Sequence, residues 1–316
     1  MKNKILITGA TGFVGANLVR AFLKNKSYEV NIITRKNSNL WRIKPILGDV
    51  KNYKVDLLEK EKLKKVITEI KPDYIIHLAI YGGRPFENDD EKIIAANFQG
   101  TINLLEACNN IDYKIFLNTG SSSEYGKKSH PMEENEICEP INIYGISKLS
   151  ATLYCNYIAN RDNKNIGTIR LFSPFGDYEG TGRLFPDLIL NALENKTIEL
   201  GNPKAVRDFI YIDQVIKVYE KIINENINIK GEIFNLGFGE QHSVEYCAKK
   251  VLEYTKSNSK LKFGALEARK SDSNIWVSDM SKTKKWLKLE IKLDFDSQIK
   301  KACEWFAENK KLYNIK

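Results

Sequence analysis

The stretch INIYGISKLS (141–150) sets Tyr144 four residues before Lys148. On a helix this spacing brings both side chains to one face. A phenol with its ordinary pKa of about 10 exchanges protons poorly at pH 7, but a nearby ammonium stabilises the phenolate and lowers that pKa. Such a pair can move a proton on or off an alcohol oxygen. The spacing alone proves little, because Tyr246 and Lys250 share it and chance predicts about two such pairs.

A run of serines gives the first pair a context that the second pair lacks. The stretch FLNTGSSSEYG (116–126) ends an apolar run on hydroxyls that include Ser121 and Ser122. A serine hydroxyl beside a phenol can hold the substrate oxygen while the proton moves. The second pair has no such neighbours, so the sequence predicts an ordinary helix face there.

Three glycines follow the first apolar run, in ILITGATGFVG. Glycines between a strand and a helix let the backbone approach a pyrophosphate, whose charge the helix N-terminus favours. The spacing Gly-x-x-Gly-x-x-Gly differs from the commoner Gly-x-Gly-x-x-Gly, and a turn without a ligand is the alternative. We predict dinucleotide binding, with contacts from Gly9, Thr11, Gly12, Phe13, Val14 and Gly15.

The second predicted strand ends in Arg35 and Lys36. An acidic residue there would bind the ribose 2′-hydroxyl of NAD, whereas cations suit a 2′-phosphate. The sequence therefore favours NADP(H) over NAD(H), although loop cations are also common as plain surface residues. His77 alone is expected to be a core residue. Further cofactor contacts are predicted where the third and fourth strands end, at Asp56, Leu57, Leu78 and Ala79.

Continuous apolar runs alternate with amphipathic helical patterns in the first half of the chain, which is typical of a parallel sheet covered on both faces. We expect an α/β fold, a Rossmann-type doubly wound parallel sheet with a smaller C-terminal α/β substrate lobe. The predicted domains are 1–172 plus 208–238 for the cofactor, and 173–207 plus 239–316 for the substrate. The strands are predicted at 4–9, 29–34, 52–57, 73–79, 114–120 and 165–171, and the helices at 13–25, 59–70, 91–109 and 144–160.

Composition narrows the function classes. A hydrophobic content of 42% and a charged content of 28% in 316 residues are ordinary for a soluble protein. No apolar run approaches the length of about 20 residues that a membrane span needs, and no signal peptide is recognisable. Five scattered cysteines indicate free thiols and a cytoplasmic protein, and three histidines argue against a metal centre.

The formal net charge of +9 raises the question of nucleic-acid binding. The lysines are spread among acidic residues and are not interleaved with aromatic ones, so we expect a solvated surface and no nucleic-acid partner. A basic cleft would still suit an anionic small substrate.

The motifs together resemble the extended short-chain dehydrogenase/reductase family, in its branch of sugar-nucleotide epimerases, dehydratases and reductases. The resemblance runs nearly end to end. TGATGFVG resembles the glycine motif of that family, DLLE its adenine-contact turn, ANFQGTINLLEAC (96–108) its dimer-side helix, and SSSEYG with YGISK its Ser-Tyr-Lys site. The resemblance implies a nucleoside-diphosphate sugar substrate, a homodimer, and catalysis by Ser121, Tyr144 and Lys148. A one-residue alignment gap would move the serine role to Ser122.

Two later segments carry the implied substrate contacts. RLFSPFG (170–176) resembles a family segment that usually reads Arg-Pro-Phe-Asn-Val-Tyr-Gly, with Ser173 and Phe175 replacing the Asn and Tyr. VRDFIYIDQV (206–215) resembles the segment whose arginine binds the substrate diphosphate; Arg–Asp pairs with Asp208 or Asp272 are the alternative. The implied substrate-binding residues are Ser121, Ser122, Ser173, Arg183, Leu184, Arg207 and Arg269.

Two residue types that are missing from the sequence indicate which reaction within the family is favoured. Family dehydratases carry an Asp-Glu pair after the active-site Thr, where this chain has Ser122 and Ser123, so dehydration is disfavoured. The missing NAD-selecting acid favours a 4-ketoreductase that consumes NADPH, and a looser similarity to CDP-abequose and CDP-paratose synthases agrees. A 4-epimerase with tightly bound NAD(P) and a non-catalytic NADP-binding protein are the alternatives.

Overall fold

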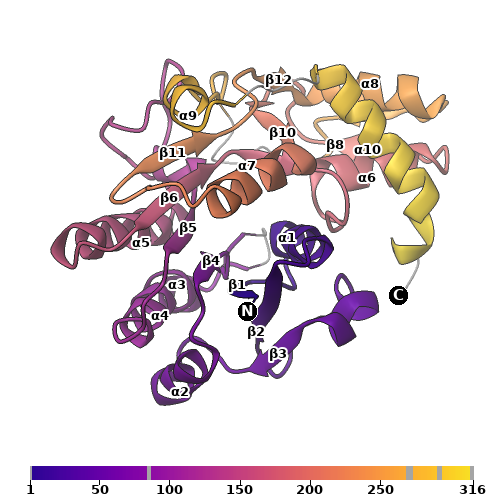
Figure 1. Ribbon diagram of the computed structural model, residues 1–316. Coiled ribbons are helices and arrows are strands. Elements are labelled where there is room, and N and C mark those ends of the chain that lie inside the picture. Colours follow the sequence, from indigo (N-terminus) through magenta and orange to yellow (C-terminus); the bar gives the residue numbers. More distant parts are fainter. Residues whose placement is uncertain (1, 84–86, 268–272, 290–293, 314–316) are drawn as a thin grey trace. The chain divides into compact units, whose positions relative to one another are not determined.

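The computed structural model describes residues 2–83, 87–267, 273–289 and 294–313 (Figure 1). The chain forms two compact units. The first comprises Met1–Gly126, Ile137–Leu171 and Ile216–Phe234, and the second Lys127–Glu136, Phe172–Val215 and Asn235–Lys316. The sequence-based division instead placed 127–136, 172, 208–215 and 235–238 in the cofactor domain.

One sheet in the described part of the chain has seven strands in the order β11-β6-β5-β4-β1-β2-β3. The pairings that join β6 through β3 are all parallel. The order reverses at β1, as in doubly wound folds, and the Rossmann-type prediction is confirmed. The strands are β1 (Asn3–Thr8), β2 (Tyr28–Thr34), β3 (Lys51–Lys54), β4 (Tyr74–His77), β5 (Ile115–Ser121), β6 (Ile166–Leu171) and β11 (Ile233–Leu236).

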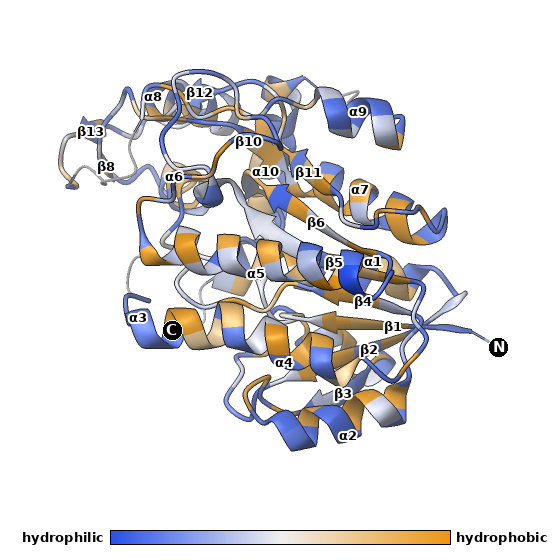
Figure 2. Cartoon of the chain, turned by 90° about the vertical axis from the view of Figure 1, so that its left-hand side faces the viewer, coloured by the Kyte–Doolittle hydropathy of each residue, from blue (hydrophilic) through white to orange (hydrophobic). Residues whose placement is uncertain are grey.

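Helices of the first unit cover the sheet. In Figure 2, α2 (Lys60–Ile70), α4 (Gly100–Ala107) and α5 (Ile143–Arg161) lie over one face of the strands. Their apolar sides join the strands in a buried core that includes Leu63, Leu104 and Phe116. The remaining helices are α1 (Phe13–Lys24), α3 (Asp90–Ile94) and α7 (Ile212–Asn224), which spans the boundary between the units.

The predicted helix at 91–109 is interrupted. Between α3 and α4 lies a π-helical turn, Ala95–Gln99. Such turns take up one extra residue and often lie at functional sites. The apolar period alone could not reveal it, because the pattern continues on both sides of the turn.

The second unit has its own aromatic core. Phe175 stacks on Phe185 with ring centroids 4.0 Å apart and meets Phe209 and Phe295 edge to face. Phe175, where the resembled family has Tyr, is therefore a packing residue. The elements of this unit are β7 (Ser173–Phe175), α6 (Leu184–Ala192), β8 (Ile198–Leu200), β9 (Val206–Arg207), β10 (Phe209–Tyr211), β12 (His242–Ser243), α8 (Val244–Thr255), β13 (Leu261–Phe263), α9 (Ser281–Leu287) and α10 (Phe295–Asn309).

Two expectations about the chain as a whole can be compared with these elements. None of the described helices is long and apolar enough to cross a bilayer. All five cysteines are free, which agrees with the absence of a disulfide framework.

Candidate active site

The glycine turn between β1 and α1 leaves no room for side chains. Gly9 has a φ of 68°, and a Cβ on it would lie 2.6 Å from the Leu78 carbonyl carbon. A Cβ on Gly15 would lie 2.3 Å from the Gly9 carbonyl oxygen. The α1 helix begins at Phe13 without a side-chain cap, so its first amides and its dipole face the turn. This cradle fits the pyrophosphate of a dinucleotide.

The predicted adenosine contacts surround this turn in the first unit. Arg35 and Lys36 are exposed just after β2. Asp56 is half-buried, and one of its carboxylate oxygens accepts a hydrogen bond from the Leu58 amide at 3.0 Å. Leu57 is buried beside it. The amides of the residues predicted after β4, Leu78 and Ala79, donate to the Thr8 hydroxyl at 3.2 and 3.3 Å.

Arg42 contacts the glycine turn and was not among the cofactor-site residues predicted from the sequence. Its side chain is buried, its guanidinium lies over the Trp41 ring at 4.5 Å, and Nη1 donates to the Thr11 carbonyl at 3.3 Å. This places a cation directly behind the glycine turn, where it favours bound phosphate. The arginine in the loop NLWRI belongs to no motif with a defined spacing, so the sequence alone could not predict this contact with the glycine turn.

His77 lies in the core, as expected. Two backbone amides donate to the Thr8 hydroxyl, so that hydroxyl donates to His77 Nδ1 at 2.7 Å. His77 Nε2 then donates to Thr101 Oγ1 at 2.9 Å, and the Thr101 hydroxyl donates its own proton to the Asn97 carbonyl. Burial lowers the pKa of His77 to about 3. The imidazole is therefore neutral and structural.

The start of α5 is packed against the serine turn. Asn142 caps the helix by accepting from the Gly145 amide at 2.8 Å. A Cβ on Gly145 would lie 2.4 Å from the Ser123 carbonyl oxygen, so only glycine allows this approach. Tyr144 is half-buried at this junction, and Lys148 follows one turn later on the same helix face.

Lys148 is 1% exposed, and none of the described residues accepts a hydrogen bond from its ammonium. Burial lowers the pKa of Lys148, and the charge of Glu124 opposes that shift. A buried ammonium is costly unless something else satisfies it. Hydroxyls of a bound nicotinamide ribose would do so, which fits the expected cofactor.

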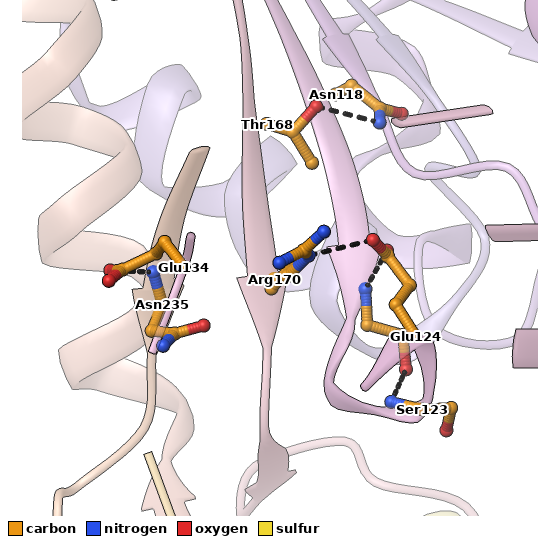
Figure 3. Close-up of polar contacts among 8 residues, drawn as sticks. Asn118, Ser123, Glu124, Glu134, Thr168, Arg170 and Asn235 are labelled. Carbon is orange, nitrogen blue, oxygen red and sulfur yellow. Dashed lines mark hydrogen bonds and ion pairs between the residues drawn. The ribbon is translucent and has the colours of Figure 1, made fainter. Parts of the chain in front are cut away.

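Ser121 ends β5 in a capping box (Figure 3). Its Oγ accepts a hydrogen bond from the Ser123 amide at 3.1 Å, and its amide donates to Glu124 Oε1 at 2.8 Å. No described group accepts the Ser121 hydroxyl proton, so that proton is left for a ligand oxygen. Ser122 is buried in the same turn.

The π-helical turn contributes Asn97, a second residue that sequence reasoning missed. Its side chain accepts from the Tyr81 amide at 2.8 Å and donates to the Tyr81 carbonyl and to Ser147 Oγ, both at 2.9 Å. Asn97 thus joins the loop after β4 to the helix that carries Tyr144.

The second Tyr-x-x-x-Lys pair provides a comparison. Tyr246 donates to Asp296 Oδ1 at 2.6 Å, and Lys250 lies 2.9 Å from the same carboxylate. Both side chains join α8 to α10, and this ion pair accounts for their positions. The Ser243 hydroxyl beside this pair accepts from the Tyr246 amide at 3.1 Å as the cap of α8.

The predicted substrate residues lie in the second unit, apart from Ser121 and Ser122. Ser173 begins β7, Arg183 is exposed just before α6 and Leu184 is the first residue of that helix. Arg207 lies over the Trp276 ring at 5.2 Å. Arg269 and Asp272, its proposed structural partner, lie outside the described residues.

The other Arg–Asp alternative concerned Asp208. Its buried carboxylate accepts hydrogen bonds from the amides of Phe238, Gly239 and Ser278 and from the Ser278 hydroxyl. Burial raises the pKa of Asp208 to about 6. This carboxylate therefore organises the loop at Phe238, and these donors account for its hydrogen bonds without Arg207.

Comparison with known proteins decides the family. The model of the NAD dependent epimerase/dehydratase family matches residues 5–237. The chain belongs to this family. The resemblance to extended short-chain dehydrogenases/reductases and the expectation of an NAD(P)-dependent oxidoreductase-type enzyme are thereby confirmed.

Individual members of the family are similar over nearly their whole length. A UDP-glucose 4-epimerase of Mycoplasma genitalium is 30% identical, over 92% of each chain. A UDP-glucuronate 4-epimerase of Thermodesulfobacterium geofontis is 26% identical, over 96% of each. The crystal structure of UDP-glucuronic acid 4-epimerase from Bacillus cereus, in complex with UDP-glucuronic acid and NAD, superposes with a TM-score of 0.86 at 26% identity, covering 97% of this chain and 99% of that one.

Proposed function

We propose that this protein is a nucleotide-sugar 4-epimerase that oxidises and re-reduces C4 of a nucleoside-diphosphate sugar, with UDP as the nucleotide. The observation that carries the proposal is the junction of β5 and α5. There Ser121 has a free hydroxyl proton, and Tyr144 lies one helical turn before a buried ammonium. The named relatives favour this reaction over the 4-ketoreductase that the sequence suggested.

Each side chain has one task in this proposal. A nicotinamide bound beside these residues would supply hydride exchange at C4, and inversion requires that hydride return to the opposite face of C4. Ser121 donates a hydrogen bond to the C4 oxygen and holds it beside the phenol. Tyr144, as the phenolate, takes the hydroxyl proton and later gives it back. Lys148 stabilises that phenolate and binds the ribose hydroxyls.

Dehydration is disfavoured by the contacts of Glu124. Family dehydratases need an acid that can reach the sugar, and only a shifted alignment would give Glu124 that task. Its side chain is fully buried, and its two oxygens accept hydrogen bonds from the Ser121 amide and from Arg170. This carboxylate is therefore structural.

The substrate diphosphate is assigned to Arg207, with Arg183 and Ser173 as further contacts. The support is their cationic or hydroxyl chemistry and the family segments in which they occur. The adjacent carboxylate of Asp208 is occupied by amides and a hydroxyl. Arg207 itself lies over the Trp276 ring at 5.2 Å, and its Nη1 donates to the Val206 carbonyl at 2.6 Å.

A 4-ketoreductase that consumes NADPH is the second candidate. It is favoured by Arg35 and Lys36, which are exposed just after β2 where NAD enzymes of this fold commonly have an acid. Arg42 behind the glycine turn adds a third cation near the same ribose.

One experiment separates the two candidates. Purified protein is incubated with UDP-glucose or UDP-glucuronate without added cofactor, and the C4 epimer is followed by NMR. A parallel reaction mixes a nucleotide 4-keto sugar with NADPH and follows absorbance at the reduced nicotinamide band. Epimer formation without added cofactor supports the epimerase, and stoichiometric NADPH loss supports the reductase. Inactivity in both overturns C4 chemistry and leaves the non-catalytic alternative.

We also propose a homodimer through the helices predicted for it. On α5, Ile146, Leu153 and Tyr157 are 46%, 58% and 55% exposed and recur at helical spacing. Ile94 at the end of α3 is exposed as well. Figure 2 shows α5 on the side of the sheet that faces the viewer, with apolar residues along its length. An exposed apolar stripe of this kind is typical of an interface.

A further inference from the structure

We infer that Glu124, held by Arg170, is a positioning residue that sets the geometry between the Ser121 hydroxyl and Tyr144. This inference rests on the proposed function and assigns a task to two residues that touch neither cofactor nor substrate. It follows from the contacts of the serine turn with its surroundings in the first unit.

The Glu124 carboxylate is fixed on both oxygens (Figure 3). Oε1 accepts from the Ser121 amide and Oε2 from Arg170 Nε, each at 2.8 Å, and the side chains of Glu124 and Arg170 are 0% and 3% exposed. A Cβ on Gly120 would lie 2.5 Å from Oε1, so β5 has a glycine where the carboxylate passes. The Arg170 guanidinium also lies 4.5 Å from the Tyr125 ring. Arg170 on β6 therefore clamps the whole turn.

The clamp controls the direction of the Ser121 hydroxyl. Because Glu124 binds the Ser121 amide, the turn closes and the Ser123 amide reaches Ser121 Oγ. One of the two lone pairs of that oxygen is thereby occupied, and the proton has no acceptor among the described residues, so the proton can be offered to a ligand. Without the clamp, the hydroxyl could rotate to accept from solvent or ligand instead.

The same turn also supports Tyr144. The Ser123 carbonyl is the atom against which Gly145 packs, and the Glu139 amide donates to the Tyr125 carbonyl at 3.1 Å. The loop that enters α5 and the first turn of α5 are thus both bound to the turn that Glu124 closes. A shift of this turn changes the separation of Ser121 and Tyr144.

Glu124 has a second, electrostatic effect on the site. Its charge raises the pKa of Lys148 against the effect of burial. Apart from Tyr144, its partner in the proposed chemistry, the other titratable groups facing this ammonium are Cys155 on the same helix, whose pKa burial raises to about 12, and His77 on β4, which is neutral. Cys155 and His77 are uncharged at neutral pH, so Glu124 is the carboxylate acting on Lys148.

The test uses a single and a paired substitution. In Glu124→Gln an NH2 group replaces one of the two carboxylate oxygens and faces either the Ser121 amide or Arg170, both of which are donors. The clamp therefore breaks, and a buried cation loses its counter-charge. In Glu124→Gln/Arg170→Gln the amide oxygen can accept from Ser121 while the amide nitrogen donates to the second glutamine. The double variant restores the contact without charge, and keeps the test valid if the single variant folds poorly.

Thr119→Val is the matched control. Thr119 lies on the same strand as Ser121, two residues earlier, and the substitution removes its buried hydrogen bond of 2.8 Å with the Tyr219 hydroxyl. We expect kcat of Glu124→Gln to fall about 10–100-fold with a smaller change in KM, because misplacing a catalytic group acts mainly on the transition state. Thr119→Val keeps the wild-type kcat. The paired variant recovers most of kcat, but its pH–kcat profile moves to lower pH because the anion near Lys148 is gone.

Combining Glu124→Gln with Ser121→Ala tests whether Glu124 acts through the Ser121 hydroxyl. If Glu124 acts through Ser121, adding Glu124→Gln to Ser121→Ala costs less than about threefold more in kcat. The inference is overturned if the two losses multiply, or if folded Glu124→Gln keeps full activity. A wild-type protein without turnover on any nucleotide sugar would instead refute the proposed function, so the two failures are distinguishable.

Discussion

Lys148→Met separates a catalytic lysine from a structural one, because the two roles predict opposite effects on stability. Lys148 is 1% exposed, and its burial lowers the pKa of the ammonium. Replacing it by an apolar chain of similar length removes a desolvated charge from the interior. We therefore expect the free energy of unfolding of the cofactor-free protein to stay unchanged or to rise, while turnover falls.

The size of the activity loss follows from the helix geometry. Residues four apart on a helix have Cβ atoms about 5–6 Å apart. Two unit charges about 6 Å apart attract by about 3 kcal/mol at an effective dielectric constant of 20, which corresponds to about a 100-fold change in the population of the phenolate. Near neutral pH the phenolate fraction, and with it kcat, should fall about 100-fold in Lys148→Met.

The stability gain should also depend on pH. Because the pKa of Lys148 is lowered in the fold, the cost of its charge is present at neutral and acidic pH and disappears as pH rises through the folded pKa toward 10.5. Urea unfolding of cofactor-free wild type and Lys148→Met across pH 7–10.5 measures this difference, and steady-state kinetics measures kcat.

Lys250→Met is the matched control, since Lys250 occupies the same position in the second Tyr-x-x-x-Lys pair and contacts Asp296. It should leave kcat unchanged. If Lys148→Met lowers stability by several kcal/mol, or keeps kcat within about threefold of wild type, the reasoning about this ammonium is refuted.

Three further predictions concern the scaffold. Gly15→Ala places a Cβ 2.3 Å from the Gly9 carbonyl oxygen and should abolish NAD(P) binding measured by calorimetry, whereas Gly48→Ala, with open space around its Cβ, should bind normally. The His77 pKa of about 3 is below its unfolded value of 6.5, so the stability that neutral His77 contributes is fully present above pH 6.5. The free energy of unfolding should fall by about 4–5 kcal/mol as pH drops toward 3. Urea titrations should show that this pH dependence vanishes in His77→Gln and persists in His130→Gln. Leu153→Glu on the exposed stripe of α5 should give monomers in analytical ultracentrifugation, while Leu266→Glu, equally exposed in the second unit, should not; a dimeric Leu153→Glu variant would place the interface elsewhere.

Six of the seven strands of the sheet were predicted from the sequence, and five of these are largely buried; β3 is more exposed, and β11 (Ile233–Leu236) was not predicted. Each predicted strand overlaps an observed one, from β1 (Asn3–Thr8) to β6 (Ile166–Leu171), and most of the errors are at the ends. A continuous apolar run is the direct signature of a strand covered by helices on both sides. The helix that carries Tyr144 was predicted to within about one residue at each end because Asn142 caps it.

Contacts between distant segments could not be predicted from spacing. Glu124 and Arg170 are 46 positions apart, and Arg42 reaches Thr11 across 31. Asn97 lies in a π-helical turn that leaves the apolar pattern intact. In each case the polar side chain binds the backbone or a partner on another element, so its role depends on tertiary structure alone. The preference for NADP also stays a prediction, since exposed cations show only that a 2′-phosphate would be tolerated.

Two glycines mark some of these tertiary contacts in the sequence. Gly145 follows Tyr144 because a side chain there would meet the Ser123 carbonyl oxygen, and Gly120 precedes Ser121 because the Glu124 carboxylate occupies the space of its Cβ. Both glycines adjoin residues to which we assign chemistry, and neither is needed for a helix or a strand, where glycine is unfavourable. They mark the points at which the serine turn meets the start of α5 and the Glu124 carboxylate. If Gly145→Ala bound cofactor normally and kept full kcat, this junction would not determine the geometry of the site.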